Sequence, residues 1–319
     1  MAKIYTYGDI KLFAGSGNPE LAEEIGDYLG QSLEDYDIIQ FPNENLFVRL
    51  KGSVRGQDVY IIQSMVPPVH QNIMELLISI DCLKRDSAGR ITAVIPYMAY
   101  ARSDKKDQPR VPITARLIAD MIEVAGTDRY MTIDLHAGQI QGFFSIPGDV
   151  LTAFHILSDY FKEKNLEDVV VATADLGFAK KGRNFAAKLG VPLAFVEKRR
   201  SDENKNARAT TVIGDVSGKD VILVDDEVLT AGSMCEAVRI IKDHGARDVY
   251  LSFTHALLVP PASEELAEMP IKEIVTTNTI PVPPEKRLPN MTILSVAPLL
   301  GEVILRAHEG RSVGELFNE

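Results

Sequence analysis

The chain has 319 residues, of which 45% are hydrophobic and 25% are charged, and its formal net charge at pH 7 is -11. This length is too great for one ordinary domain and sufficient for two, each with a sizeable core. The acidic balance argues against a nucleic-acid-binding protein, which usually carries a basic surface. Neither a secretory signal nor an apolar run long enough to span a bilayer is recognisable, so we expect a cytoplasmic protein without a membrane partner.

Short apolar runs alternate with amphipathic stretches along the chain. Strand-like runs, rich in β-branched residues, occupy residues 91–97, 169–173, 221–224 and 249–254. They are apolar at successive positions, which is typical of strands buried on both faces. Apolar residues at helical spacing occupy residues 73–80, 113–122 and 231–244. This alternation predicts an α/β fold with two doubly wound domains, whose parallel sheets are covered by helices on both faces.

The domain boundary is expected near residues 148–151, between two strand–helix series. We therefore predict an N-terminal domain of residues 1–149 and a C-terminal domain of residues 150–319, with the final helix able to pack back on the first domain. Ligands of such sheets bind beyond the carboxyl ends of the strands. Side chains that follow strands are therefore the first candidates for a site.

The strongest local motif is VILVDDEVLTAGS at residues 221–233, in which an apolar strand ends in paired carboxylates and a short loop opens a helix. Asp225 and Asp226 can accept hydrogen bonds from the vicinal hydroxyls of a sugar. The backbone amides of the loop, with the hydroxyls of Thr230 and Ser233, can hold a phosphate at the helix N-terminus. The alternative interpretation is an ordinary strand and capped helix with solvated carboxylates.

This motif is similar to the phosphoribosyl-binding loop of type I phosphoribosyltransferase folds. The chain as a whole resembles the ribose-phosphate diphosphokinase (PRPP synthetase) family. The likeness is carried by segments such as SVRGQDVYIIQS, RITAVIPYMAYAR, MTIDLHAGQIQGFF, GDVSGKDVILVDD and ILSVAPLLGEVI. It implies two phosphoribosyltransferase-like domains that transfer the diphosphoryl group of ATP to the anomeric hydroxyl of ribose 5-phosphate. The products would be PRPP and AMP. The cofactor would be Mg²⁺.

The resemblance also assigns roles to residues that bind the sugar phosphate and the metal ion. Ribose 5-phosphate binding falls on Asp225, Asp226, Leu229, Thr230, Ala231, Gly232 and Ser233. Metal binding is implied for His136, in IDLHAGQIQGF, and for Asp175, in ATADLGF. A lone histidine also fits a structural role, and it is an unusual partner for Mg²⁺, which prefers oxygen ligands. Leu229 replaces an aspartate of the family, and Phe178 replaces a glycine of its diphosphate loop.

The ATP side is implied by three further segments. In QFPNEN, Phe41, Asn43 and Asn45 correspond to a loop that reaches ATP from a neighbouring subunit, with both asparagines in place of carboxylates and Glu44 in place of a glycine. ATP contacts are also implied for Arg102, Ser103, Asp104 and Lys105, with Ser103 in place of a glutamine. Lys198 and Arg200, in EKRRSDENKNAR, correspond to a mobile catalytic arm that neutralises the charge on the transferring group. By composition alone this stretch is a solvated loop.

The resemblance implies a homo-oligomer, expected to be a hexamer, because the family builds its ATP site across subunits. Ser53, Arg55 and Ser312 match the family's phosphate and ADP effector site, whereas Gly314 replaces a second tail serine, so we expect weakened activation by phosphate. Departures in the ATP and diphosphate loops leave one main alternative, a non-catalytic regulatory subunit of a PRPP synthetase assembly. A phosphoribosyltransferase that consumes PRPP is a third possible function, and the resemblance of the N-terminal half to the synthetase family disfavours it.

Overall fold

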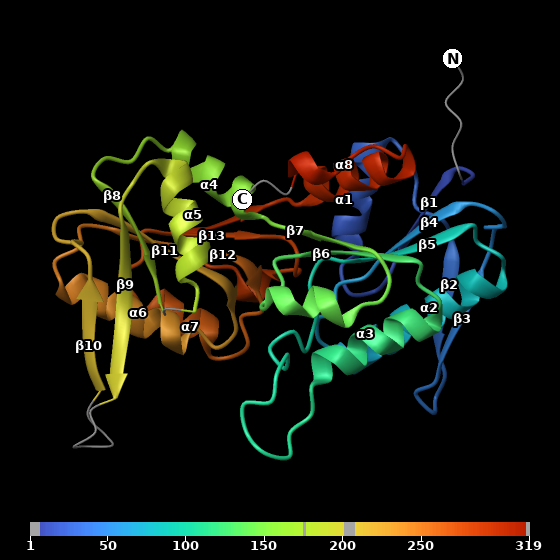
Figure 1. The fold of residues 1–319 in the computed structure, drawn as a ribbon, viewed down its shortest axis with the longest axis horizontal. Coiled ribbons are helices and arrows are strands. Elements are labelled where there is room, and N and C mark those ends of the chain that lie inside the picture. The colour runs from blue at the N-terminus through green and yellow to red at the C-terminus, as the bar shows by residue number, and fades with distance from the viewer. Residues whose placement is uncertain (1–6, 175–176, 201–207, 317–319) are drawn as a thin grey trace. The chain divides into compact units, whose positions relative to one another are not determined.

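The computed structural model describes residues 7–174, 177–200 and 208–316 (Figure 1). Contacts divide these residues into two compact units. Unit 1 comprises residues 7–152, 279–281 and 295–316, and unit 2 comprises the described residues of 153–278 and 282–294. The chain therefore passes from one unit to the other near residues 152, 278, 281 and 294. No helix among the described residues is both long and apolar enough to cross a membrane.

Unit 1 is built on a parallel sheet in the order β1-β4-β5-β6-β7. Its strands are β1 (Ile10–Ala14), β4 (Asp58–Ile62), β5 (Arg90–Ile95), β6 (Arg129–Ile133) and β7 (Gly148–Leu151). Its helices are α1 (Pro19–Leu29), α2 (Val69–Arg85), α3 (Thr114–Ala125) and α8 (Ala297–His308), with short 3-10 turns η1 (Gly138–Phe143) and η3 (Gly314–Leu316). Strands β2 (Tyr36–Gln40) and β3 (Leu46–Leu50) form a separate antiparallel hairpin.

The C-terminal helix α8 belongs to unit 1, where it packs against α1 (Figure 1). Gly301 of α8 allows this close approach, because a Cβ atom there would lie 2.3 Å from Cδ1 of Tyr28. A buried ionic cluster holds the end of the same helix. The fully buried carboxylate of Asp58 accepts hydrogen bonds from Nε and Nη2 of Arg90 at 2.8 and 2.6 Å, and lies 2.8 Å from Nδ1 of His308.

Unit 2 contains a longer sheet in the order β10-β9-β8-β11-β12-β13-β14, in which β9 and β10 pair antiparallel and the other neighbours pair parallel. Its strands are β8 (Val169–Thr173), β9 (Leu193–Arg200), β10 (Arg208–Ile213), β11 (Asp220–Val228), β12 (Val249–Ala256), β13 (Glu273–Thr277) and β14 (Met291–Leu294). Its helices are α4 (Phe154–Glu163), α5 (Ala179–Leu189), α6 (Gly232–Asp243) and α7 (Ala262–Ala267), with a 3-10 turn η2 (Pro284–Lys286).

The predicted α/β class with parallel sheets is confirmed, and β8 coincides with the run predicted at residues 169–173. Two details of the sequence interpretation are wrong. The strand predicted to end before Asp225 continues to Val228, because Glu227 and Val228 still pair with β12. Leu117, assigned to an inward helical face, is 55% exposed. Both errors concern positions at which tertiary contacts, rather than local pattern, decide the structure.

Candidate active site

Paired carboxylates lie near the carboxyl end of β11, in the centre of the unit 2 sheet. Asp225 is half-buried and Asp226 is buried, at 6% exposure. Oδ1 of Asp225 accepts a hydrogen bond from the amide of Asp226 at 2.9 Å, and Oδ1 of Asp226 accepts one from the amide of Glu227 at 2.9 Å. These bonds fix each carboxylate to the backbone. Ionised carboxylates only accept hydrogen bonds, so the pair is suited to ligand groups that donate, such as hydroxyls.

The loop after β11 presents the N-terminus of α6. Ala231 adopts a left-handed conformation, with φ 64°, and α6 starts at the next residue without a side-chain cap. The backbone of the loop is held by a hydrogen bond, in which the carbonyl of Leu229 accepts from the amide of Val259 at 2.8 Å. Thr230 and Ser233 are exposed, and a Cβ atom at Gly232 would meet nothing within 4 Å. First-turn amides of a 12-residue helix without a side-chain cap form a site suited to an anion.

A second group of candidates follows β6 in unit 1. Asp134 comes directly after this strand with φ 43°, is buried, and accepts a 2.8 Å hydrogen bond from Oγ1 of Thr152. His136, two residues on, is exposed. The other predicted metal ligand, Asp175, lies outside the described residues. Within the described ranges, no cluster of three or more histidine, cysteine, aspartate or glutamate side chains could hold a metal ion.

The segment predicted to contact ATP is tied to the His136 segment. Asp104, 7% exposed, accepts a short hydrogen bond from Nε2 of Gln139, which follows His136 in η1. Arg102 and Lys105, on either side, are exposed. The hydroxyl of Ser103 accepts a 3.2 Å hydrogen bond from the amide of Thr114, and is therefore engaged with the first turn of α3. The structure thus joins the segment of Arg102 and Lys105 to the segment that follows His136, while Ser103 has a local partner.

The predicted nucleotide loop is the tip of the β2–β3 hairpin. Phe41 is 46% exposed, and its ring centroid lies 6.1 Å from that of Phe47. Oδ1 of Asn43 accepts a 3.3 Å hydrogen bond from the amide of Asn45. Glu44, between them, has a φ of 65°, a conformation that favours glycine. The tip therefore presents to solvent two aromatic rings, two amide side chains and the carboxylate of Glu44.

The remaining predicted residues lie apart from these groups in the chain. Lys198 lies near the end of β9, and Arg200 is its last residue. Residues 201–207 of the predicted arm lie outside the described ranges. Among the effector candidates, the amide of Arg55 donates to Oγ of Ser53 at 3.4 Å. Oγ of Ser312 accepts a hydrogen bond from the amide of Gly314 at 3.2 Å. Each of these two contacts stays within its own segment.

Comparison with known proteins decides the family. Residues 10–126 match the N-terminal domain of ribose phosphate pyrophosphokinase, and residues 201–318 match the phosphoribosyl synthetase-associated domain. The ribose-phosphate pyrophosphokinase of Caldanaerobacter subterraneus subsp. tengcongensis is 50% identical over 309 residues, which are 97% of this chain and 98% of the relative. The chain belongs to the ribose-phosphate pyrophosphokinase family. The pyrophosphokinase of Oceanobacillus iheyensis is 46% identical over 318 residues and all of both chains.

A solved structure extends this relationship to the fold. The phosphoribosylpyrophosphate synthetase from Mycobacterium smegmatis matches with a TM-score of 0.90 and 43% identity, covering 95% of this chain and 99% of that one. The resemblance recognised in the sequence is thus confirmed. The two domain matches leave out residues 127–200, which contain His136, Asp175, Lys198 and Arg200, but the full-length pyrophosphokinases cover this stretch.

The sequence interpretation missed two residues whose side chains form hydrogen bonds to buried aspartates of the candidate site. Gln139 bonds to Asp104, and Thr152 bonds to Asp134. Gln139 lies inside the motif IDLHAGQIQGF, so its position beside His136 was a usable signal. Thr152 offers no comparable signal, because it follows a different strand, β7, and meets Asp134 only through the parallel pairing of β6 with β7.

Proposed function

We propose that this protein is a ribose-phosphate pyrophosphokinase, a transferase that forms PRPP and AMP from ATP and ribose 5-phosphate. The anomeric oxygen of the sugar attacks the β-phosphorus of ATP, and the bond to the bridging oxygen of AMP breaks. The observation that carries the proposal is the full-length relationship to proteins named for this activity, at 46–50% identity. The alignment with the Oceanobacillus iheyensis protein covers all of both chains, so no segment of this chain is left over that would call for another function.

The geometry of unit 2 supports the sugar side of this reaction. Asp225 and Asp226 accept hydrogen bonds from the ribose hydroxyls, and their backbone anchors keep both carboxylates at the strand end. The amides of the loop before α6, with the hydroxyls of Thr230 and Ser233, hold the 5-phosphate. Charge and hydrogen-bond direction match the substrate at both ends, because hydroxyls donate to carboxylates and phosphate oxygens accept from amides.

The ATP side is proposed for unit 1. Arg102 and Lys105 are exposed cations beside the buried Asp104, which Gln139 holds in place. Phe41, Asn43 and Asn45 are assigned to the nucleotide of a neighbouring copy in a homo-oligomer, which we propose to be a hexamer. Lys198 and Arg200 neutralise the charge that develops on the transferring diphosphoryl group, since electrostatic placement dominates phosphoryl transfer.

A divalent metal ion is proposed as cofactor, and Mg²⁺ as that ion, with His136 and Asp175 as the residues that hold it. An exposed imidazole after a strand end suits this role only in part, because Mg²⁺ prefers oxygen ligands and retains water. His136 is therefore assigned to a water on the ion or to a phosphate oxygen. When bound, the ion neutralises charge on the polyphosphate.

Location and regulation are proposed in keeping with the same relationship. We propose a cytoplasmic enzyme, and an effector site for phosphate and ADP that includes Ser53, Arg55 and Ser312. A regulatory, non-catalytic subunit is the second candidate. The observation that favours it is the local engagement of the Ser103 hydroxyl with Thr114, which takes a predicted ATP contact away from the nucleotide.

An AMP-release assay with ATP, Mg²⁺ and ribose 5-phosphate tests the proposal. We expect PRPP and AMP in equal amounts, and a fall in kcat of about 100-fold or more for Lys198→Ala, because one preorganised charge at the transition state is lost. Lys272→Ala, which removes a cation on the surface of unit 2, is the matched control and should keep wild-type activity. Wild-type protein as inert as Lys198→Ala with every nucleotide would instead favour the regulatory subunit.

A further inference from the structure

A third carboxylate lies at the carboxyl end of β11, beyond the two that are assigned to the sugar. The strand continues to Val228, and from Asp225 onward its residues alternate between half-buried and buried. Asp225 and Glu227 are the half-buried members. Because side chains two residues apart point to the same face of a strand, these two carboxylates share one face. The amide of Glu227 donates to Oδ1 of Asp226 at 2.9 Å, which fixes the backbone from which the Glu227 side chain projects.

The order of the strands places Glu227 where a parallel sheet binds ligands. From β8 the chain continues to β9 on one side, and from β11 it continues to β12 on the other side, so the connections diverge between β8 and β11. The crevice beyond the carboxyl ends of the strands at such a point is the usual ligand site of an open α/β sheet. β8 pairs with β11 only as far as Val224, whereas β12 pairs with it as far as Val228. The edge of β11 toward β8 is therefore not covered by that strand at Glu227.

The β12 side of Glu227 is closed by a buried histidine. His255 is the register partner of Glu227 on β12 and is 3% exposed. Neighbouring strands lie about 4.8 Å apart, so register partners in a parallel pair present their side chains next to each other on one face. A buried neighbour keeps water away from one side of the Glu227 carboxylate, and a hydrogen bond is electrostatically stronger where water is excluded. Glu227 is thus a stronger acceptor than a fully solvated carboxylate would be.

The proposed substrate has one hydroxyl more than the paired aspartates account for. In its furanose form, ribose 5-phosphate carries hydroxyls at C1, C2 and C3. The vicinal hydroxyls at C2 and C3 are assigned to Asp225 and Asp226, and the phosphate is assigned to the loop before α6. The hydroxyl at C1 remains, and Glu227 is the next side chain on the face of Asp225. Leu229, two residues further, cannot accept a hydrogen bond, although it stands where the family has an aspartate.

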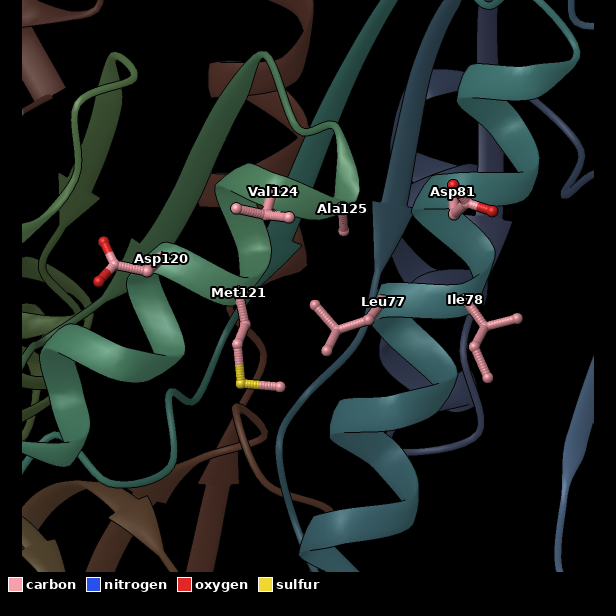
Figure 2. A pocket seen from close by; sticks show the side chains of 7 residues that line it. All are labelled: Leu77, Ile78, Asp81, Asp120, Met121, Val124 and Ala125. Atoms are coloured by element: carbon pink, nitrogen blue, oxygen red, sulfur yellow. The ribbon is translucent and has the colours of Figure 1, made fainter.

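A groove in unit 1 has the opposite chemical character. It has a volume of about 540 Å³ and lies between α2 and α3, where Leu77, Met121 and Val124 line it (Figure 2). The polar side chains that line it are the carboxylates of Asp81 and Asp120, whose charge repels a phosphate. The end of β11, in contrast, offers carboxylates to the hydroxyls and helix-terminal amides to the phosphate, so a sugar phosphate fits there.

We propose that Glu227 accepts a hydrogen bond from the anomeric hydroxyl of ribose 5-phosphate and so orients the oxygen that attacks ATP. The inference rests on the proposed function and adds one substrate contact to it. In this arrangement each of the three sugar hydroxyls donates to a carboxylate of its own. Holding the attacking oxygen in one orientation favours the reaction, since a reactant held close to its reactive geometry has less entropy to lose on the way to the transition state.

Isothermal titration calorimetry in the presence of Mg²⁺ and α,β-methylene-ATP tests this contact with two sugar phosphates. One is ribose 5-phosphate, and the other is 1,4-anhydroribitol 5-phosphate, which differs from it only in lacking the anomeric hydroxyl. Glu227→Gln should weaken ribose 5-phosphate binding by about 5- to 10-fold, because a neutral amide replaces a charged acceptor. The affinity for the anhydroribitol should change by less than about two-fold, because this compound has no hydroxyl to donate to residue 227.

Two further variants complete the experiment. Glu227→Met has a side chain of similar length without an oxygen acceptor, so it should weaken ribose 5-phosphate binding by about 10-fold or more and again spare the anhydroribitol. Glu268→Gln is the matched control, because Glu268 is an exposed carboxylate at the end of α7 in the same unit, and it should bind both compounds as wild type does. Far-UV circular dichroism and thermal unfolding check that each variant is folded.

The outcomes separate this contact from the proposed function. A wild type that does not bind ribose 5-phosphate would overturn the proposed function and this inference with it. A wild type that binds ribose 5-phosphate and forms PRPP, but whose Glu227 variants lose affinity for neither compound or equally for both, would overturn only the role of Glu227.

Discussion

Replacing Ala231 by valine should disable the phosphate loop through backbone strain alone. Ala231 is 4% exposed and holds a φ of 64° immediately before α6. A left-handed conformation costs an L-residue about 1–2 kcal/mol, and a β-branched side chain fits it worse still. Two added methyl groups at a buried position cost about 1–3 kcal/mol more. Valine is therefore expected to leave this conformation and to turn the amides of Gly232 and Ser233 away from the ligand.

The effect on binding follows from the hydrogen bonds that are lost. A hydrogen bond from a backbone amide to a charged group is worth about 1.5–3 kcal/mol. The loss of one such bond therefore weakens ribose 5-phosphate binding by about 10- to 150-fold. Isothermal titration calorimetry with ribose 5-phosphate measures this, and titration with a non-hydrolysable ATP analogue should be unchanged. Ala231→Gly is the control, because glycine adopts the same φ without strain and should keep near-wild-type affinity. Valine and glycine variants of equal affinity would refute the assignment of the phosphate to this loop.

Three further predictions concern the sugar, the nucleotide and the effect of pH on stability. Asp225→Asn should weaken ribose 5-phosphate binding more than ATP binding, since a charge-assisted bond to the sugar is lost; equal losses in both titrations would contradict this. Nucleotide selection should be loose, because Asn43 and Asn45 offer only neutral amides, and Asn43→Asp with Asn45→Glu should raise the ratio of kcat/KM for ATP over GTP. An unchanged ratio would mean that the hairpin tip does not read the base. Burial opposes ionisation of Glu273, but hydrogen bonds, chiefly from Lys164, outweigh it and hold its pKa below the usual 4.5. The contribution of the ionised Glu273 to stability is therefore complete above pH 4.5 and is lost as the pH falls through the lowered pKa. The free energies of unfolding of Glu273→Gln and wild type, measured in urea, should therefore differ at pH 7 and converge at low pH. A difference that persists in acid would refute this.

The strands and the fold class were predictable because buried parallel strands have a local signature. The run at residues 169–173 is β-branched and apolar at successive positions, and β8 has these bounds. The extension of β11 past Asp225 was not predictable in this way, because its carboxylates break the apolar pattern. Pairing of Glu227 with His255 on β12 continues the strand, and that partner lies 28 residues away in sequence. Local pattern therefore sets where a buried strand lies, and neighbouring strands set where it ends.

Candidate site residues could be named from the sequence, and their roles stay predictions, but the contacts that hold them could not be foreseen. Resemblance to a family assigned Asp104 and His136, but the bond from Gln139 that joins their segments spans 35 positions in the chain. The engagement of Ser103 with Thr114 was equally hidden, because both are small polar residues in a stretch dense in charge. The roles of all these candidates stay predictions, and Asp175 and residues 201–207 also lie outside the described ranges.

The place of α8 in unit 1 sets the order in which the chain can mature during synthesis. Residues 7–152 leave the ribosome first, yet the helix that covers α1 and brings His308 to the buried Asp58 is made 156 residues later. At about 5–20 residues per second, this delay is roughly 8–30 s. Unit 2, nearly continuous from residue 153 to residue 294, can complete its core within that interval. The half that is translated first is therefore the last to become fully folded, and a ribosome that stops before α8 leaves that half, rather than the nearer one, exposed to proteases.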